Sequence, residues 1–195
     1  MQPAKLDLNI VQGSTLRDTL RIMSPRVAYR TITAIAATAP VRLTVDHGLP
    51  SDWLAWIQGV QLMPELNRAP RREQPHRVEV IDTMTLEINA LSAVGRNASG
   101  GQLIYQQPVD LTGATARMQI RDKPGGLLRL ELTTEGGGLV ITGAGTLERH
   151  LSATTTAAIT WAEGVYDLEV TYADGTVHRY FEGAVTVSPE VTRDD

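Results

Sequence analysis

The sequence has no cysteine among its 195 residues. This absence excludes a disulfide-stapled scaffold, a cysteine-ligated zinc site and a thiol nucleophile. No apolar run approaches the roughly 20 residues that a membrane-spanning helix needs. The opening residues, MQPAKLDLNI, lack the basic and then apolar pattern of a secretory signal peptide. We therefore expect no membrane partner.

Basic residues are outnumbered by acidic ones, 18 against 22, which gives a formal net charge of -4. A general nucleic-acid binder shows the opposite balance, so we expect no nucleic-acid partner. Aromatic residues make up only 5% of the chain. A carbohydrate-binding module needs exposed aromatic side chains, and this composition therefore makes glycan recognition an alternative and not the first hypothesis.

Apolar and polar residues alternate with a period of two in several segments, which is typical of strands with one buried face. Tyr166, Leu168 and Val170, for example, alternate with acidic residues. The same pattern occurs in 6–10, 16–22, 114–120 and 128–132, although Asp18 occupies an apolar position in its segment. Further candidate strands are 31–36, 41–45, 54–60, 77–81, 85–88 and 102–106.

Turn-forming residues separate these segments. Asp174-Gly175 predicts a tight hairpin, because glycine readily takes the positive φ that such a turn needs. The glycine-rich stretches 122–126 and 135–138 predict two further turns, and Ser152 predicts the cap of one short helical turn within 152–159. Short strands at this spacing predict an all-β fold, either a sandwich or a barrel.

Several sequence blocks occur in a recognisable order at the two ends of the chain. They are VDLTG at 109–113, ARMQIR at 116–121, GVYDLEV at 164–170 and EGAVTV at 182–187, preceded by IVQGST at 10–15. In this order they resemble the amino-terminal β-sandwich of tailed-phage upper-baseplate adaptors, which attach receptor-binding proteins to the tail. The resemblance implies an immunoglobulin-like β-sandwich that is discontinuous in sequence, formed by residues 1–30 and 108–195.

The middle of the chain contains VRLTVDHGL at 41–49, WIQGV at 56–60 and ELN at 65–67. These blocks resemble a small β-barrel-like module that phage tail proteins carry as a structural insert. The module is also the first catalytic-cysteine half-domain of ubiquitin-activating enzymes, but this chain has no cysteine for thioester chemistry. The resemblance implies an inserted domain at 31–107, which a host domain tolerates because loop-closure entropy grows slowly with length.

Residues with catalytic or metal-binding chemistry do not form a known motif. The four histidines, His47, His76, His150 and His178, form neither an HxH nor an HxxxH pair. Asp167 and Glu169 share one face of a strand, which indicates a polar outer face and not the acid pair of a glycosidase. We therefore expect a protein that is not an enzyme, with no catalytic residue, cofactor or metal.

The candidate partner-contact residues lie in the middle segment. They are Arg68, Arg71, Arg72 and Arg77, which form the densest basic stretch, together with Trp53 and Trp56. The arginines fit either an acidic neighbour or a solvated loop restrained by two prolines. The two tryptophans lie on opposite faces of a strand, so both cannot enter one core and one of them is available to a partner.

The resemblances imply a structural component of a tailed-phage virion, in the tail tip or baseplate. Its partners would be other virion proteins and further copies of itself, and its location the virion tail after assembly in the host cytoplasm. The alternatives are a capsid decoration or head–tail joining protein, and a carbohydrate-binding module for host surface glycans.

Overall fold

The computed structural model describes residues 2–190 and divides into two compact units. The first unit, here called the sandwich unit, consists of the residues up to Ile22 and from Asp110 onward. The second, here called the insert unit, is Met23–Val109. Strands account for 51% of the structure and helices for 4%, which confirms the predicted all-β class. In residues 2–190, no helix has the length and apolar character that a bilayer crossing requires.

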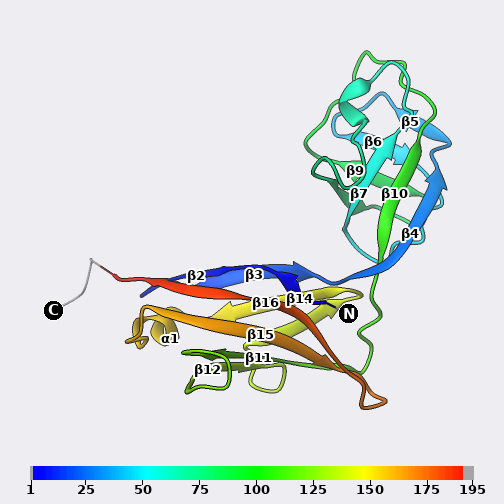
Figure 1. Cartoon of the computed structure of the whole chain (residues 1–195). Helices are drawn as coiled ribbons and strands as arrows, with labels where there is room; N and C mark the ends of the chain where they lie inside the picture. The colour runs from blue at the N-terminus through cyan, green and yellow to red at the C-terminus, as the bar shows by residue number, and fades with distance from the viewer. Residues whose placement is uncertain (1, 191–195) are drawn as a thin grey trace. The chain divides into compact units, whose positions relative to one another are not determined.

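The sandwich unit contains two sheets and one short helix (Figure 1). The larger sheet has the strand order β1-β16-β15-β11-β12, with β2 also paired to β16, and the smaller has the order β13-β14-β3. Their core includes Met118, Leu147 and Leu168, which are fully buried. The elements are β1 (Ala4–Lys5), β2 (Leu8–Val11), β3 (Leu16–Arg21), β11 (Thr115–Arg121), β12 (Leu128–Thr133), β13 (Leu139–Gly143), β14 (Thr146–Leu151), α1 (Ala153–Ala157), β15 (Glu163–Thr171) and β16 (Val177–Ser188).

Strands from the two ends of the sequence pair with each other in this unit. β1 and β2 run parallel to successive parts of β16, and β3 runs antiparallel to β14. Between β1 and β2 the chain passes close to Gly183, where an added Cβ atom would lie 2.3 Å from the carbonyl oxygen of Leu6. Glycine therefore permits the close approach of the amino-terminal segment to β16.

Local sequence signals identify most of these elements. Ser152 caps α1 by accepting a hydrogen bond from the Thr155 backbone N–H, as predicted. Gly175 has φ of 83° in the hairpin between β15 and β16. The predicted alternation is wrong at Leu128, which is exposed, because the pairing of β12 with β11 shifts by one residue at Arg129. Such a bulge ends the regular alternation of faces.

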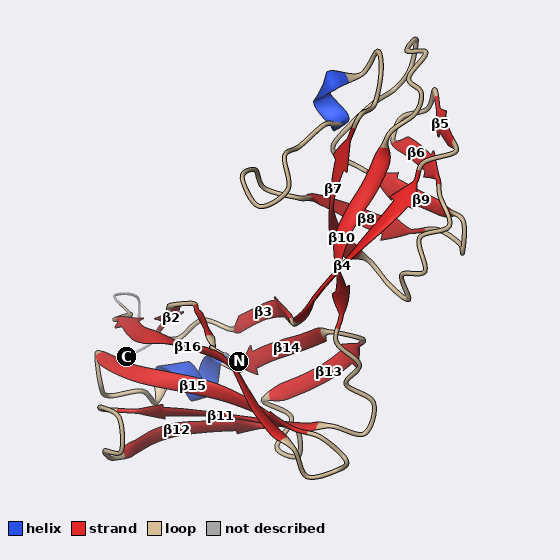
Figure 2. Cartoon of the chain, turned by 45° about the vertical axis from the view of Figure 1, so that its right-hand side comes forward, coloured by secondary structure: helices blue, strands red, loops and turns tan. Residues whose placement is uncertain are grey.

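The insert unit contains one curled sheet with the strand order β4-β10-β7-β8-β9-β6-β5 (Figure 2). Its first and last strands are consecutive in sequence and are joined by Ile32 and Thr33. The Ile32 N–H donates to Gly101, next to β10, whereas the Thr33 N–H donates to Thr44 of β6. Ile32 and Thr33, which are adjacent in the chain, are therefore hydrogen-bonded to opposite edges of the sheet, and they connect these edges where the sheet curls round. The elements are β4 (Met23–Thr31), β5 (Ala34–Ala36), β6 (Val41–Thr44), β7 (Trp53–Gln58), η1 (Pro64–Leu66), β8 (His76–Val80), β9 (Thr85–Ile88) and β10 (Gln102–Pro108).

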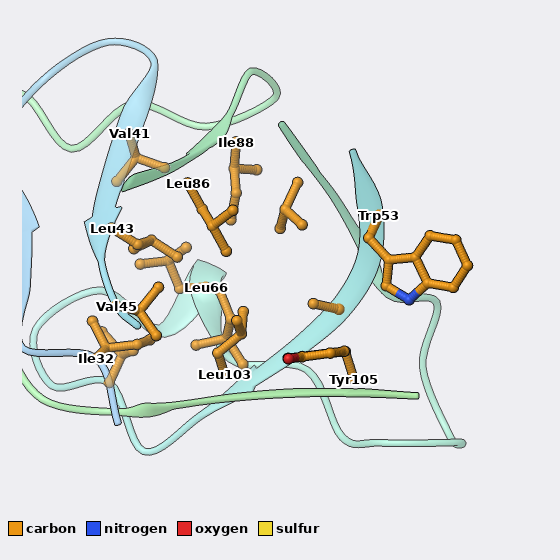
Figure 3. Packing of buried hydrophobic residues seen from close by; sticks show 14 of the residues in the cluster. Ile32, Val41, Leu43, Val45, Trp53, Leu66, Leu86, Ile88, Leu103 and Tyr105 are labelled. Atoms are coloured by element: carbon orange, nitrogen blue, oxygen red, sulfur yellow. The ribbon is translucent and has the colours of Figure 1, made fainter. Parts of the chain in front are cut away.

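One apolar cluster fills the curled sheet. Figure 3 shows Leu43, Leu86 and Leu103 pointing into the same space from three different strands, with Trp53 at the edge of the cluster. The three leucines are fully buried. At about 25 cal/mol per Å² of apolar surface removed from water, such a cluster gives the insert unit its own source of stability.

The domain boundaries differ from those expected. The sequence places residues 23–30 in the sandwich and 31–107 in the insert, but Met23–Thr31 forms β4, which pairs with β10 along its length. These residues therefore belong to the insert unit. The sequence of β4 hides its role, because Ala28 is its only buried residue and the strand shows no alternation of apolar side chains.

Candidate functional site

A row of large side chains crosses the outer face of the insert unit. Tyr29 of β4 lies opposite Ile104 of β10, and Ile104 lies opposite Trp56 of β7. The sequence neighbours Ala28 and Leu103 belong to the core, so these three side chains point to the other face. Tyr29 is 59% exposed and Trp56 half-buried, whereas Ile104 between them is only 3% exposed. The row thus presents two aromatic rings beside a covered aliphatic side chain.

An arginine extends this surface onto the next strand. Leu54 lies two residues before Trp56 on β7 and is half-buried. It lies opposite Arg77 of β8, which is exposed. We call this surface the arginine–aromatic face. It consists of Tyr29, Leu54, Trp56, Arg77 and Ile104, together with the loop arginines described next.

The loop that carries Arg71 and Arg72 is held by several hydrogen bonds. The Trp56 indole N–H donates to the carbonyl oxygen of Glu73 over 2.7 Å. Arg68 Nη1 donates to the carbonyl oxygens of Gln74 and Pro75, at 2.9 and 3.1 Å. The Glu73 carboxylate accepts from the backbone N–H of Ala69 at 2.5 Å. These contacts fix the loop against the aromatic row and lower the entropy it would lose on binding.

Arg71 and Arg72 form the tip of this loop, and both are exposed. The Arg72 N–H closes a turn on the Ala69 carbonyl oxygen at 3.2 Å. Arg71 has φ of 62°, a left-handed conformation that is uncommon for a residue with a Cβ atom. Within residues 2–190, neither guanidinium makes an ion pair. The loop thus presents two cations with no counter-charge bound to them.

The structure places only four of the six predicted partner-contact residues on one surface. Trp56, Arg71, Arg72 and Arg77 lie on the arginine–aromatic face. Trp53 does not, because it is only 1% exposed and its indole N–H donates to the Gln106 carbonyl oxygen at 2.7 Å. The prediction that the two tryptophans face opposite sides is confirmed.

Arg68 and His76 hold the loop in place and are not free to bind a partner. Arg68 is half-buried and its guanidinium is bound to two carbonyl oxygens of the loop. His76 is 3% exposed, and its Nε2 lies 2.9 Å from the carbonyl oxygen of Leu66. Removal from water disfavours the imidazolium form, and this burial lowers the pKa of His76.

Sequence reasoning missed Tyr29, Leu54 and Ile104. Their position on one surface follows from the pairing of strands that are far apart in the chain, and a local period does not contain this information. The one signal in the sequence is an aromatic residue, Tyr29, close to two arginines, Arg26 and Arg30.

The acidic pair of the sandwich unit, Asp167 and Glu169, is surrounded by arginine side chains. Arg179 Nη2 is 3.0 Å from Asp167 Oδ2 and 3.5 Å from Glu169 Oε1, and Arg117 Nη2 is 3.6 Å from the other Glu169 oxygen. These residues form a network of exposed and half-buried ion pairs on the larger sheet. Such networks suit a solvated face, where each pair contributes little.

The histidines occupy separate surroundings. His47 is buried in a turn, where its Nδ1 accepts from the Leu49 N–H at 3.0 Å and its Nε2 lies 2.7 Å from the Asp82 carbonyl oxygen. His178 packs on Tyr180, with ring centroids 5.9 Å apart. Within residues 2–190, no three histidine, aspartate or glutamate side chains come together in a way that could hold a metal ion.

Comparison with known proteins gives no family. No family model matches the chain, and no curated protein sequence matches it either. The geometry of the arginine–aromatic face therefore carries the functional argument.

Proposed function

We propose that the chain is a structural subunit of a tailed-phage virion, in the tail tip or baseplate, and that it works by adhesion between subunits. The arginine–aromatic face of the insert unit is the observation that carries this proposal. Tryptophan, tyrosine and arginine are the residue types that contribute most at protein interfaces. Here Tyr29, Trp56 and Arg77 lie on one face, and the loop that carries Arg71 and Arg72 is hydrogen-bonded to Trp56.

The division into two units supports the same proposal. A subunit that joins two proteins needs two independent surfaces, and a sandwich unit and an insert unit each supply one. Repeated copies in a symmetric particle multiply modest contacts through avidity, so neither surface needs high affinity alone. The resemblance of the terminal blocks to upper-baseplate adaptors supports the tail as the proposed location.

Mass spectrometry of purified phage particles from cells that produce this chain tests the proposal. We expect its peptides in intact particles at a fixed ratio to the tail proteins, and immunogold labelling at the tail. Label on the capsid would instead support the decoration or head–tail joining alternative. Absence of the peptides from washed particles would contradict a structural role.

The same face also favours a second candidate function, a module that binds host glycans. It presents exposed Tyr29, half-buried Trp56 and exposed Arg77. Aromatic rings stack on the apolar faces of sugars, and arginine binds their hydroxyl or carboxylate groups. A glycan array with the purified chain separates the two functions. Binding to one glycan class that is lost in Tyr29→Ala would support this candidate, and an array without binding would reject it.

A further inference from the structure

The two units have net charges of opposite sign. The insert unit, Met23–Val109, contains 8 basic and 7 acidic residues, a net charge of +1. The remaining residues contain 10 basic and 15 acidic residues, a net charge of -5, and the two values give the total of -4. The insert unit of one copy and the sandwich unit of another therefore carry net charges of opposite sign, which favours a contact between these two units over a contact between two sandwich units.

The sandwich unit carries a pocket with the chemistry that complements an arginine. This shallow pocket, of about 440 Å³, lies at the hairpin between β15 and β16 and is here called the hairpin pocket. It is lined by Asp110, Thr112, Tyr172, Ala173, Asp174, Thr176 and His178. Two carboxylates and two aromatic rings thus border one space. Guanidinium groups bind carboxylates through paired hydrogen bonds and stack on aromatic rings.

Both carboxylates are ionised, and each is hydrogen-bonded only within its own turn, so each can still accept hydrogen bonds from a ligand. Asp110 Oδ1 accepts from the backbone N–H and the hydroxyl of Thr112, at 2.9 and 2.7 Å. Asp174 Oδ1 accepts from the Thr176 N–H at 2.9 Å. These hydrogen bonds lower the pKa of both aspartates. Among the described residues, Asp110 Oδ2 accepts no hydrogen bond, and the side-chain partner of Asp174 is Thr176 of its own turn.

The aromatic wall of the hairpin pocket is held together by a hydrogen bond and two ring contacts. The hydroxyl groups of Tyr172 and Tyr180 are 2.5 Å apart. The His178 ring is stacked on Tyr180 and meets Tyr172 edge-on, with a centroid distance of 5.7 Å. Burial, followed by the hydrogen bond with Tyr180, raises the pKa of Tyr172, so its hydroxyl is neutral near pH 7. A cation that enters the pocket meets two fixed carboxylates and a preorganised ring surface.

We infer that the hairpin pocket of one copy receives the loop arginines, Arg71 and Arg72, of a second copy. The arginines are exposed without an ion pair and are held by a fixed loop, and the pocket offers two carboxylates that, within residues 2–190, make no ion pair. The contact joins different surfaces of the two copies, so it is heterologous and extends to a ring or a filament. This inference rests on the proposed function and names how the subunits contact one another.

Sedimentation velocity of the purified full chain tests the inference with two variants. Arg71→Glu/Arg72→Glu removes the loop cations, and Asp110→Asn/Asp174→Asn removes the pocket charges while keeping oxygens that accept the turn hydrogen bonds. We expect the wild-type chain to self-associate at low salt and to dissociate as salt rises. Each variant weakens association by on the order of tenfold or more, because charge-assisted hydrogen bonds are lost.

An equimolar mixture of the two variants provides the sharper readout. The first variant keeps an intact pocket and the second keeps intact loop arginines, so the mixture forms heterodimers and nothing larger. Arg17→Glu/Arg129→Glu, which changes the net charge equally at exposed sites of the sandwich unit, should associate like the wild type. Thermal unfolding by circular dichroism checks that every variant is folded.

Three results would overturn the inference: a wild-type chain that stays monomeric at low salt, a mixture that does not form heterodimers, or variants that associate as the wild type does. These results are independent of the test of the proposed function. Peptides found in particles, together with a chain that does not self-associate, would reject the docking mode alone. Self-association without the peptides in particles would reject the virion role alone.

Discussion

Arg149 of β14 is only 2% exposed and donates two hydrogen bonds to the carboxylate of Asp18 on the neighbouring strand β3. The distances are 2.9 Å from Nε to Oδ1 and 2.5 Å from Nη2 to Oδ2. The guanidinium carbon also lies 5.6 Å from the ring centroid of Tyr166, on the larger sheet. Asp18 therefore occupies an apolar position of β3 because a buried cation lies beside it.

This pair predicts opposite outcomes for single and double substitutions. Asp18→Ala leaves a buried guanidinium without its counter-charge and should lower the free energy of unfolding by about 3 kcal/mol. Asp18→Leu/Arg149→Met replaces the pair with apolar groups and should restore most of that loss. Urea unfolding followed by fluorescence measures both. A stability of Asp18→Ala equal to the wild type would contradict the assigned role of the pair.

The two tryptophans predict a difference in stability. Trp53→Ala removes a side chain from the edge of the insert core, and we expect it to cost about 3–5 kcal/mol. Trp56→Ala should cost less, because the ring is half-buried and lies outside the core, with its indole N–H bound to the Glu73 carbonyl oxygen. Thermal unfolding of the two variants compares them directly. Equal losses would contradict the placement of Trp56 on the outer face.

His76 predicts a loss of stability in acid. Its pKa is lowered in the folded state, so below the ordinary value of 6.5 the unfolded chain binds a proton that the folded chain does not. Stability then falls as the pH decreases from about 6.5 toward the lowered pKa, with a slope of at most about 1.4 kcal/mol per pH unit from this group. His76→Gln, which keeps a donor for the Leu66 carbonyl, should reduce that slope. An identical pH dependence in the variant would contradict the prediction.

The close approach of the amino-terminal segment to Gly183 can be tested by substitution. Gly183→Ala places a methyl group 2.3 Å from the Leu6 carbonyl oxygen, and we expect a loss of about 1–3 kcal/mol. Hydrogen exchange should increase in β1, which must move away from β16. Unchanged exchange in β1 and unchanged stability would show that the amino-terminal segment does not cross β16 at this point.

Much of the sandwich unit could be predicted from the sequence, because its strands bury one face and expose the other. Leu168 and Val170 show this in β15. β14 was not predicted, since Arg149 occupies a core position between Leu147 and Leu151 and breaks the apolar period. A buried arginine depends on a carboxylate from a strand that is distant in sequence, and a local pattern cannot reveal it.

The candidate site was predictable only in part. The arginines of the loop and the opposite faces of Trp53 and Trp56 follow from residue type and strand parity. The arginine–aromatic face also needs Tyr29 and Ile104, which meet through non-local pairing. The division of the basic stretch between the structural Arg68 and the exposed Arg71 likewise depends on contacts that only the fold provides.

The most direct test of the central claim is particle assembly in cells whose phage lacks this gene product. The wild-type chain, Arg71→Glu/Arg72→Glu and the matched Arg17→Glu/Arg129→Glu are supplied in trans, and the titre of complete particles is measured. We predict that the loop variant is folded but gives at least tenfold fewer particles, whereas the matched variant restores the titre. Full restoration by the loop variant would contradict the claim that the chain works through its arginine–aromatic face.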